Sequence, residues 1–260
     1  DVVPNPFVDY LNSMNNADAN GKGALAESQV TSLYYEKVLV RRAVSDILKE
    51  QIVSQPCTVV LTGHAGDGKT SLLAQLLRDL ECISSGQTLK NSDEVQSFEG
   101  LRLFYVKDMS ELTKREQVNL LERALKAPEN GMSALLVSNT GPLINAAKRL
   151  ITGASDDEMN LLVMELLECM DSNEPKQVNI AGMPCYIINV ARLDNVDMGP
   201  RIFANLLHGE LWKECNRCEL SSACPIRNNQ QSASRLREQI SHFVTAYYRY
   251  LQEHDNRLTV

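Results

Sequence analysis

The sequence predicts an α/β protein in which a parallel sheet is flanked by helices and followed by a helical C-terminal lid. Between residues 58 and 190, short apolar runs rich in β-formers alternate with segments of helical periodicity. After Pro200 only helical periodicity remains. We therefore divide the chain into an N-terminal part of loop and helices (1–55), a sheet-containing core (56–198) and the helical lid (199–260).

The N-terminal part and the start of the core follow from local signals. Prolines, glycines and asparagines predict loop over 1–24, and apolar spacing predicts one or two amphipathic helices over 26–53. We expect a buried strand at 58–62, a helix at 69–80 and a polar loop over 83–99.

The remaining elements are predicted in the same way. The patterns Thr113-x-x-Glu116 and Ser155-x-x-Glu158 are capping boxes, each of which predicts the start of a helix. The expected strands are 101–106, 134–138 and 185–190, the expected helices are 113–126, 142–151, 155–170, 201–212 and 231–253, and 172–183 is expected to be loop.

The most informative segment is Gly-His-Ala-Gly-Asp-Gly-Lys-Thr at residues 63–70. It matches G-x-x-x-x-G-K-[ST], the phosphate-binding loop. Average residue usage gives such a match by chance in roughly 1% of chains of this length. Here an apolar strand precedes it and a helical segment follows it, which is the context that the motif requires. The sequence therefore predicts a nucleotide-binding protein.

Each residue type in the loop has a chemical role. Glycines let the backbone direct its N–H groups at phosphate oxygens, and the following helix adds the positive end of its dipole. Lys69 supplies a charge near the β- and γ-phosphates, and Thr70 offers a hydroxyl to Mg²⁺. The predicted nucleotide-binding residues are Gly63, Ala65, Gly66, Asp67, Gly68, Lys69, Thr70 and Ser71.

A nucleotide hydrolase also needs an acid at the end of a neighbouring strand. Asp108 comes directly after the strand at 101–106, and we interpret it as the Walker B acid that holds Mg²⁺ together with Thr70. Met109 stands where a catalytic Glu usually follows, so either Glu111 is the base or the chain has none. The alternative is that Asp108 and Ser110 only begin the next helix.

Three further polar residues follow strands or open the lid. Asn139 ends the strand at 134–138, where a polar sensor would touch the γ-phosphate or the attacking water. The alternative is that Asn-Thr-Gly forms a turn. Arg192 and Arg201 are arginine-finger or sensor candidates, although a surface arginine is the simpler interpretation of each.

A cysteine cluster lies in the lid, at Cys215-x2-Cys218-x5-Cys224-Pro225. Cys-x2-Cys is metal-ligand spacing, and the fourth ligand would be His208, His242, Cys185 or a remote cysteine. The spacing also resembles the three-cysteine end of iron–sulfur clusters in AddB-type helicase-nucleases. Structural zinc, a structural iron–sulfur cluster and no metal all stay open. The other four cysteines, at 57, 82, 169 and 185, fit small buried apolar positions.

Composition limits the classes of function. The net charge of −7 gives no general electrostatic attraction to nucleic acid. No signal peptide and no apolar run of 18 residues is visible, so we expect a soluble cytoplasmic protein without membrane contact. Seven cysteines in such a chain favour thiols or metal ligands over disulfides. The oligomeric state, and whether the chain is a fragment, stay open.

The phosphate-binding loop, the Val-Lys-Asp-Met-Ser-Glu segment (106–111) and the Cys-x2-Cys-x5-Cys-Pro-Ile-x-x-Asn run (215–228) together resemble the DptF family. These are P-loop ATPases of bacterial DNA phosphorothioation-dependent restriction systems. The α/β core with a helical lid also resembles the AAA+ and STAND ATPases. The resemblance, over most of 30–260, implies an ATP- and Mg²⁺-dependent subunit of a restriction and antiviral defence complex that reaches DNA through its partners.

Two other functions stay open. One alternative is a nucleotide-dependent switch or scaffold with little hydrolysis. The acidic net charge and the missing Asp-Glu pair favour it. A small-molecule kinase fits the long helical tail less well. No Asn-Lys-x-Asp motif, which would read guanine, is present, so we expect ATP rather than GTP.

Overall fold

The structure is a computed structural model that describes residues 3–13, 32–64, 66–84, 87–193 and 195–254. The chain divides into two compact units. One contains residues 41–194 and holds the sheet. The other combines residues up to 40 with residues from 195 onward and is helical. The N-terminal segment and the predicted lid therefore belong to one unit, which the division drawn from the sequence did not anticipate.

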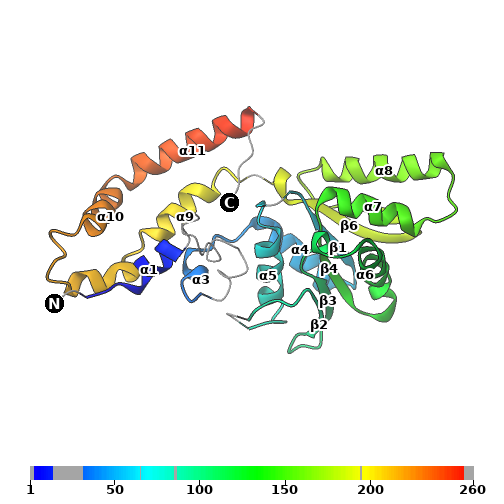
Figure 1. The fold of residues 1–260 in the computed structure, drawn as a ribbon, viewed down its shortest axis with the longest axis horizontal. Helices are drawn as coiled ribbons and strands as arrows, with labels where there is room; N and C mark the ends of the chain where they lie inside the picture. The colour runs from blue at the N-terminus through cyan, green and yellow to red at the C-terminus, as the bar shows by residue number, and fades with distance from the viewer. Residues whose placement is uncertain (1–2, 14–31, 65, 85–86, 194, 255–260) are drawn as a thin grey trace. The chain divides into compact units, whose positions relative to one another are not determined.

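The described residues of the first unit contain a mixed six-stranded sheet of order β2-β3-β4-β1-β6-β5 (Figure 1). The four central strands are parallel, whereas both edge strands, β2 and β5, are antiparallel to their neighbours. The strands are β1 (Thr58–Thr62), β2 (Ser92–Gln96), β3 (Arg102–Val106), β4 (Ser133–Val137), β5 (Lys176–Ile180) and β6 (Met183–Asn189).

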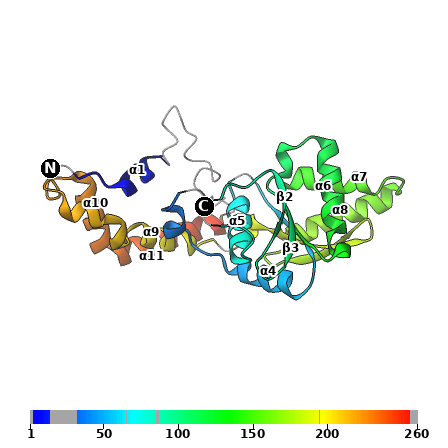
Figure 2. The same cartoon turned by 90° about the horizontal axis from the view of Figure 1, so that it is seen from below.

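Helices cover both faces of this sheet, as can be followed in Figures 1 and 2. On one face, α6, α7 and α8 pack in series and enclose a core that includes Val60, Phe104 and Leu136. On the other face, α5 contacts β1 and β4, and α4 packs against α5. The bounds are α4 (Ala43–Ser54), α5 (Lys69–Asp79), α6 (Lys114–Lys126), α7 (Thr140–Leu150) and α8 (Asp156–Met170), with 3-10 turns η2 (Met109–Glu111), η3 (Ala127–Asn130) and η4 (Val190–Arg192).

The burial of the central strands explains why they are continuous apolar runs. All five residues of β1 and all five of β4 are buried, because side chains on both faces of a parallel sheet meet helices. The two antiparallel edge strands are more polar and more exposed.

The second unit has a small aromatic core. Phe7 of α1 meets the Trp212 ring edge-on at 5.5 Å between centroids and the Tyr34 ring at 5.4 Å. The Trp212 indole N–H donates to the Leu206 carbonyl oxygen at 2.8 Å. The elements are α1 (Pro6–Ser13), α3 (Tyr35–Val38), α9 (Met198–Leu206), η5 (Gly209–Arg217), α10 (Pro225–Arg235) and α11 (Arg237–Glu253).

A glycine sets the contact between α9 and α11 in this unit. A Cβ atom built on Gly199 would overlap the Tyr248 ring, so only glycine allows the two helices to approach this closely. Most of α11 is nevertheless exposed, and none of its residues is buried.

Most predicted elements of the core are confirmed, including both capping boxes, whose reciprocal hydrogen bonds are present. Four predictions were wrong. The loop at 83–99 contains β2, and the loop at 172–183 contains β5. The sheet is mixed rather than parallel because these two edge strands are antiparallel. Helix α1 lies in the segment predicted as loop, with Pro6 as its first residue, a position where the missing N–H of proline costs nothing.

The remaining predicted helices agree with the structure in part. The predicted N-terminal helices appear as α3 and α4, while residues 26–31 lie outside the described part of the chain. In the second unit the predicted helix at 201–212 is α9 followed by η5, and the helix at 231–253 is divided into α10 and α11. Among the described residues, no helix is long and apolar enough to cross a membrane.

Candidate nucleotide-binding site

The predicted phosphate-binding loop joins β1 to α5 at the carboxyl edge of the sheet. Val60 is level with Leu136 of β4, which is level with Val106 of β3. Two residues further along these strands, Thr62 and Asp108 reach the same edge of the sheet. Adjacent strands are about 4.8 Å apart, so the backbones of β1 and β3 are separated by roughly 10 Å with β4 between them. Ligands of open α/β sheets bind at this edge.

The loop backbone has the conformation that its glycines predict. Gly63, Gly66 and Gly68 have φ angles of +140°, +85° and +78°. These values lie in the region that residues with a side chain seldom adopt. Gly68 is the N-cap of α5, so the loop passes directly into the first turn of the helix, where free N–H groups favour an anion.

Two charged side chains hold the loop from within. The Asp67 carboxylate accepts a hydrogen bond from the His64 backbone N–H at 2.5 Å. The Lys69 ammonium donates to the His64 backbone carbonyl at 2.5 Å. Asp67 is 2% exposed and Lys69 is 6% exposed, so both charges are largely removed from solvent. The Lys69 ammonium therefore lies inside the loop that the motif assigns to phosphate.

Arg42, which sequence reasoning missed, supports the loop from outside. It is the N-cap residue of α4, and its guanidinium donates to the Asp67 backbone carbonyl at 2.9 Å. A Cβ atom on Gly68 would approach the same guanidinium to 2.9 Å. Arg42 lies 25 residues before Asp67 and belongs to no local motif. The role of Arg42 is therefore visible only in the contacts of the folded chain.

The other predicted loop residues can be placed in part. Thr70 and Ser71 are half-buried in the first turn of α5, and the side chain of His64 is exposed, as expected. Ala65 lies outside the described residues. Thr70 thus follows Lys69 in the first turn of α5, the position at which this motif places its metal-binding hydroxyl.

Asp108 reaches the expected edge and also caps a helix. Its carboxylate Oδ1 accepts from the Ser110 backbone N–H at 2.7 Å, at the start of η2. Asp108 therefore begins the next helical turn, as the alternative interpretation predicts, and it uses one of its two carboxylate oxygen atoms to do so. Glu111 ends η2 and is exposed, while Met109 between them is fully buried. Asp108 and Glu111 thus stand at opposite ends of η2.

Asn139 lies between Asp108 and the loop in the order of the sheet. Its backbone N–H donates to the Ser110 hydroxyl at 3.3 Å, which connects the ends of β4 and β3. It occupies the N-cap position of α7, but its side chain makes no capping hydrogen bond. Within the described part of the chain, its buried Oδ1 atom has no hydrogen-bond partner, and neither does Thr62 Oγ1 at the end of β1.

Two buried oxygen atoms without a hydrogen-bond partner among the described residues thus lie near the predicted phosphate-binding loop. Buried polar atoms are almost always hydrogen-bonded, and a lone unsatisfied one costs about 1–3 kcal/mol. Thr62 ends β1 and Asn139 follows the neighbouring strand β4, at the edge of the sheet where the loop lies. Both could accept hydrogen bonds from a ligand or from water held by one.

Asn189, at the end of β6, borders the loop on the side away from β4. Asn189 accepts from the Ala191 backbone N–H at 3.1 Å and donates to the Met170 carbonyl at 2.7 Å. Its Oδ1 atom would be 3.3 Å from a Cβ on Gly63, so Asn189 lies directly against the loop. Arg192 pairs with Asp171 on the surface, which agrees with the simpler interpretation of a surface arginine. Arg201 is exposed in the other unit.

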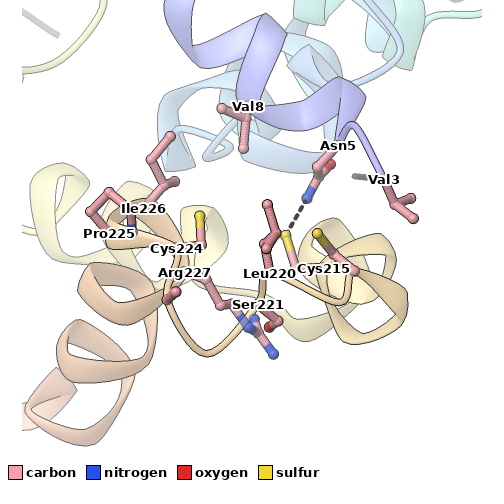
Figure 3. Close-up of a pocket in the computed structure, with 12 residues that line it drawn as sticks. Val3, Asn5, Val8, Cys215, Leu220, Ser221, Cys224, Pro225, Ile226 and Arg227 are labelled. Carbon is pink, nitrogen blue, oxygen red and sulfur yellow. Dashed lines mark hydrogen bonds between the residues drawn. The ribbon is translucent and has the colours of Figure 1, made fainter. Parts of the chain in front are cut away.

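The three clustered cysteines line one pocket in the helical unit (Figure 3). Cys215, Cys218 and Cys224 are half-buried around a cavity of about 370 Å³. Asn5, from the N-terminal segment, donates its side-chain amide to the Cys215 sulfur at 3.3 Å, the bond drawn as a dashed line in Figure 3. No set of three His, Cys, Asp or Glu side chains in the described ranges is arranged to hold a single metal ion.

The other cysteines belong to hydrophobic surroundings. Cys57, Cys169 and Cys185 are buried, and Cys82 is half-buried, so the prediction holds fully for three of the four. Burial raises the pKa of Cys185 to about 12. This residue is 1% exposed in the core of the sheet-containing unit. A thiol held protonated in that core is a poor metal ligand.

We compared the chain with protein-family models, with curated proteins and with solved structures, and none of the three comparisons gives a match.

Proposed function

We propose that this chain is an ATP-binding protein that hydrolyses ATP with Mg²⁺. The observation that carries the proposal is the position of the Lys69 ammonium, 2.5 Å from the His64 carbonyl inside a loop of three positive-φ glycines. A buried lysine and free helix N–H groups around one loop make a site for the polyanionic end of a nucleotide.

The chain's residues fit the rest of such a substrate. Thr70 would hold Mg²⁺ directly and Asp108 through water, and the ion would neutralise charge on the phosphates. Asn139 offers an unsatisfied oxygen one strand away from the loop, where it could orient a water molecule. Lys69 would exchange a neutral carbonyl for phosphate oxygens, which are stronger acceptors because they are charged.

The wider role that we propose follows from the resemblance of the three sequence segments to the DptF family. In this role the chain is the ATPase subunit of a bacterial restriction complex, and DNA is reached through partner subunits. The net charge of −7 supports an indirect contact with DNA.

A second candidate function is a nucleotide-dependent switch with little hydrolysis. One observation favours it. Asp108 uses one carboxylate oxygen to cap η2, and the only acid nearby in the sequence, Glu111, is exposed at the other end of that turn. The site then holds a nucleotide without an evident base.

Steady-state phosphate release with Mg·ATP separates these functions. The first proposal predicts saturable turnover that Mg²⁺ removal abolishes and that partner subunits or DNA increase. The switch predicts stoichiometric ATP binding with turnover near that of buffer alone under all of these conditions. Turnover that neither DNA nor partners change would contradict the restriction role, and equal competition by GTP would contradict the preference for ATP.

A further inference from the structure

The cysteine-lined pocket of the helical unit is not part of the proposed nucleotide site, and its thiols and its size indicate a ligand of its own. Three thiols surround a cavity of about 370 Å³, and most of the other lining side chains are apolar, among them Val8, Leu220 and Ile226. A cavity of this volume is in the range of small-ligand pockets and could hold several atoms. All lining residues lie in one compact unit.

A single zinc ion does not fit this arrangement. Structural zinc needs four ligands that converge on one point, with each sulfur about 2.3 Å from the ion. In the portion of the chain that the structure describes, no three ligand side chains form such a group. Cys185, one candidate for the fourth ligand, is buried in the core of the other unit.

A polynuclear cluster fits it better. In an iron–sulfur cluster each thiolate binds a different iron atom, so the sulfur atoms stand apart around a multi-atom core. The three cysteines line one cavity, and its volume of about 370 Å³ leaves room for a multi-atom core. Cys224 is also the N-cap of α10, and the positive end of that helix favours a negatively charged occupant.

Two N–H donors complete the surroundings. The Asn5 amide donates to the Cys215 sulfur, and the same Nδ2 atom donates to the Leu211 carbonyl at 3.1 Å, so the amide is fixed in place. Arg227 lines the pocket, and its buried Nε atom has no hydrogen-bond partner in the described residues. Hydrogen bonds to cluster sulfur atoms, together with a nearby cation, stabilise and tune such centres.

We therefore propose that Cys215, Cys218 and Cys224 bind an iron–sulfur cluster next to Asn5 of the N-terminal segment, inside the helical unit. Three irons would take these thiolates, and a fourth would take a ligand from outside the pocket. The occupant needs iron and inorganic sulfide.

The test is metal and sulfide analysis of the full chain after anaerobic purification and reconstitution with ferrous iron and sulfide. We expect brown protein with up to about four iron and four sulfide per chain. Cys215→Ser, Cys218→Ser and Cys224→Ser should each reduce this content, whereas the matched control Cys82→Ser should keep it. One equivalent of zinc without iron, no metal at all, or an unchanged cluster in all three variants would overturn the proposal.

A second measurement does not depend on removing a ligand. Asn5→Asp keeps an oxygen that can accept from the Phe7 backbone N–H but removes the amide donor to Cys215. The reduction potential of the cluster should fall, because an N–H···S bond is lost and a negative charge is added. An unchanged potential would contradict the assigned position of the cluster.

Discussion

The Lys69 ammonium and the His64 backbone carbonyl oxygen are 2.5 Å apart, although both belong to the same eight-residue loop. The lysine side chain thus turns back over the loop that precedes it. In the proposed function, a phosphate oxygen would replace this carbonyl as the acceptor for Lys69. The loop thus already holds a positive charge where the proposed function needs one, and Lys69 would leave the carbonyl to bind a phosphate.

The first prediction concerns the close approach of Gly63 to its neighbours. In Gly63→Ala, the new Cβ would lie 2.7 Å from Asp67 Oδ2, at a φ of +140°. The strain should cost about 1–3 kcal/mol and weaken ATP binding, as measured by chemical denaturation and calorimetry. The control is Gly141→Ala in α7, where no atom lies within 4 Å of the new Cβ. If both variants behave alike, the loop conformation is not required.

The second prediction separates the charge of Asp108 from its capping role. Asp108→Asn keeps an oxygen for the Ser110 N–H, so stability should hold, but ATP turnover should fall by roughly 100-fold or more. Asp108→Ala should lose turnover and also about 1 kcal/mol of stability because the cap is removed. ATP affinity should change little in either variant. Normal turnover of Asp108→Asn would assign the acid to another residue.

The third prediction compares two asparagines at the edge of the sheet. The Asn139 Oδ1 atom has no partner in the described chain, so Asn139→Ala should leave the free energy of unfolding nearly unchanged while turnover falls. Asn189→Ala breaks two side-chain hydrogen bonds and should cost about 1–3 kcal/mol. Denaturation and phosphate-release assays on both variants check this pair. A large loss of stability in Asn139→Ala, with full turnover, would make Asn139 a structural residue.

The fourth prediction is a pH dependence of stability. Burial raises the pKa of Cys185 from 9.0 to about 12. Below pH 9 the thiol is protonated in both the folded and the unfolded chain. Between pH 9 and 12 only the unfolded chain loses this proton, so the free energy of unfolding falls by about 1.4 kcal/mol per pH unit from this group.

The variant Cys185→Ala isolates that contribution. It should be less stable at neutral pH because a buried side chain is shortened, but its stability should decline less steeply above pH 9. Equal slopes for the wild type and the variant would show that Cys185 is not held as a protonated thiol.

The sequence predicts the central sheet well because its signals are local. The run at 58–62 is apolar throughout because both faces of β1 are covered, and Thr113 and Ser155 begin their helices through side-chain caps within four residues. The loop at 63–70 is recognised because its glycines and Lys69 act on their own neighbours.

The features that could not be predicted from the sequence depend on contacts between distant segments. Strand β2 is polar and half-exposed, so it has no apolar run, and its pairing with β3 provides its backbone hydrogen bonds. Arg42 reaches the loop from α4, and Asn5 reaches Cys215 from 210 residues away. Neither contact has a local pattern that could reveal it.

The central claim is that the loop around Lys69 binds ATP, and isothermal titration of Mg·ATP into wild type and Lys69→Ala tests it most directly. Lys69→Ala should keep the fold, by circular dichroism and thermal unfolding, but lose at least about 100-fold in affinity, or about 2.7 kcal/mol. The control Lys114→Ala, which removes an exposed lysine at the start of α6, should bind like the wild type. ATP binding by Lys69→Ala with wild-type affinity would contradict the account.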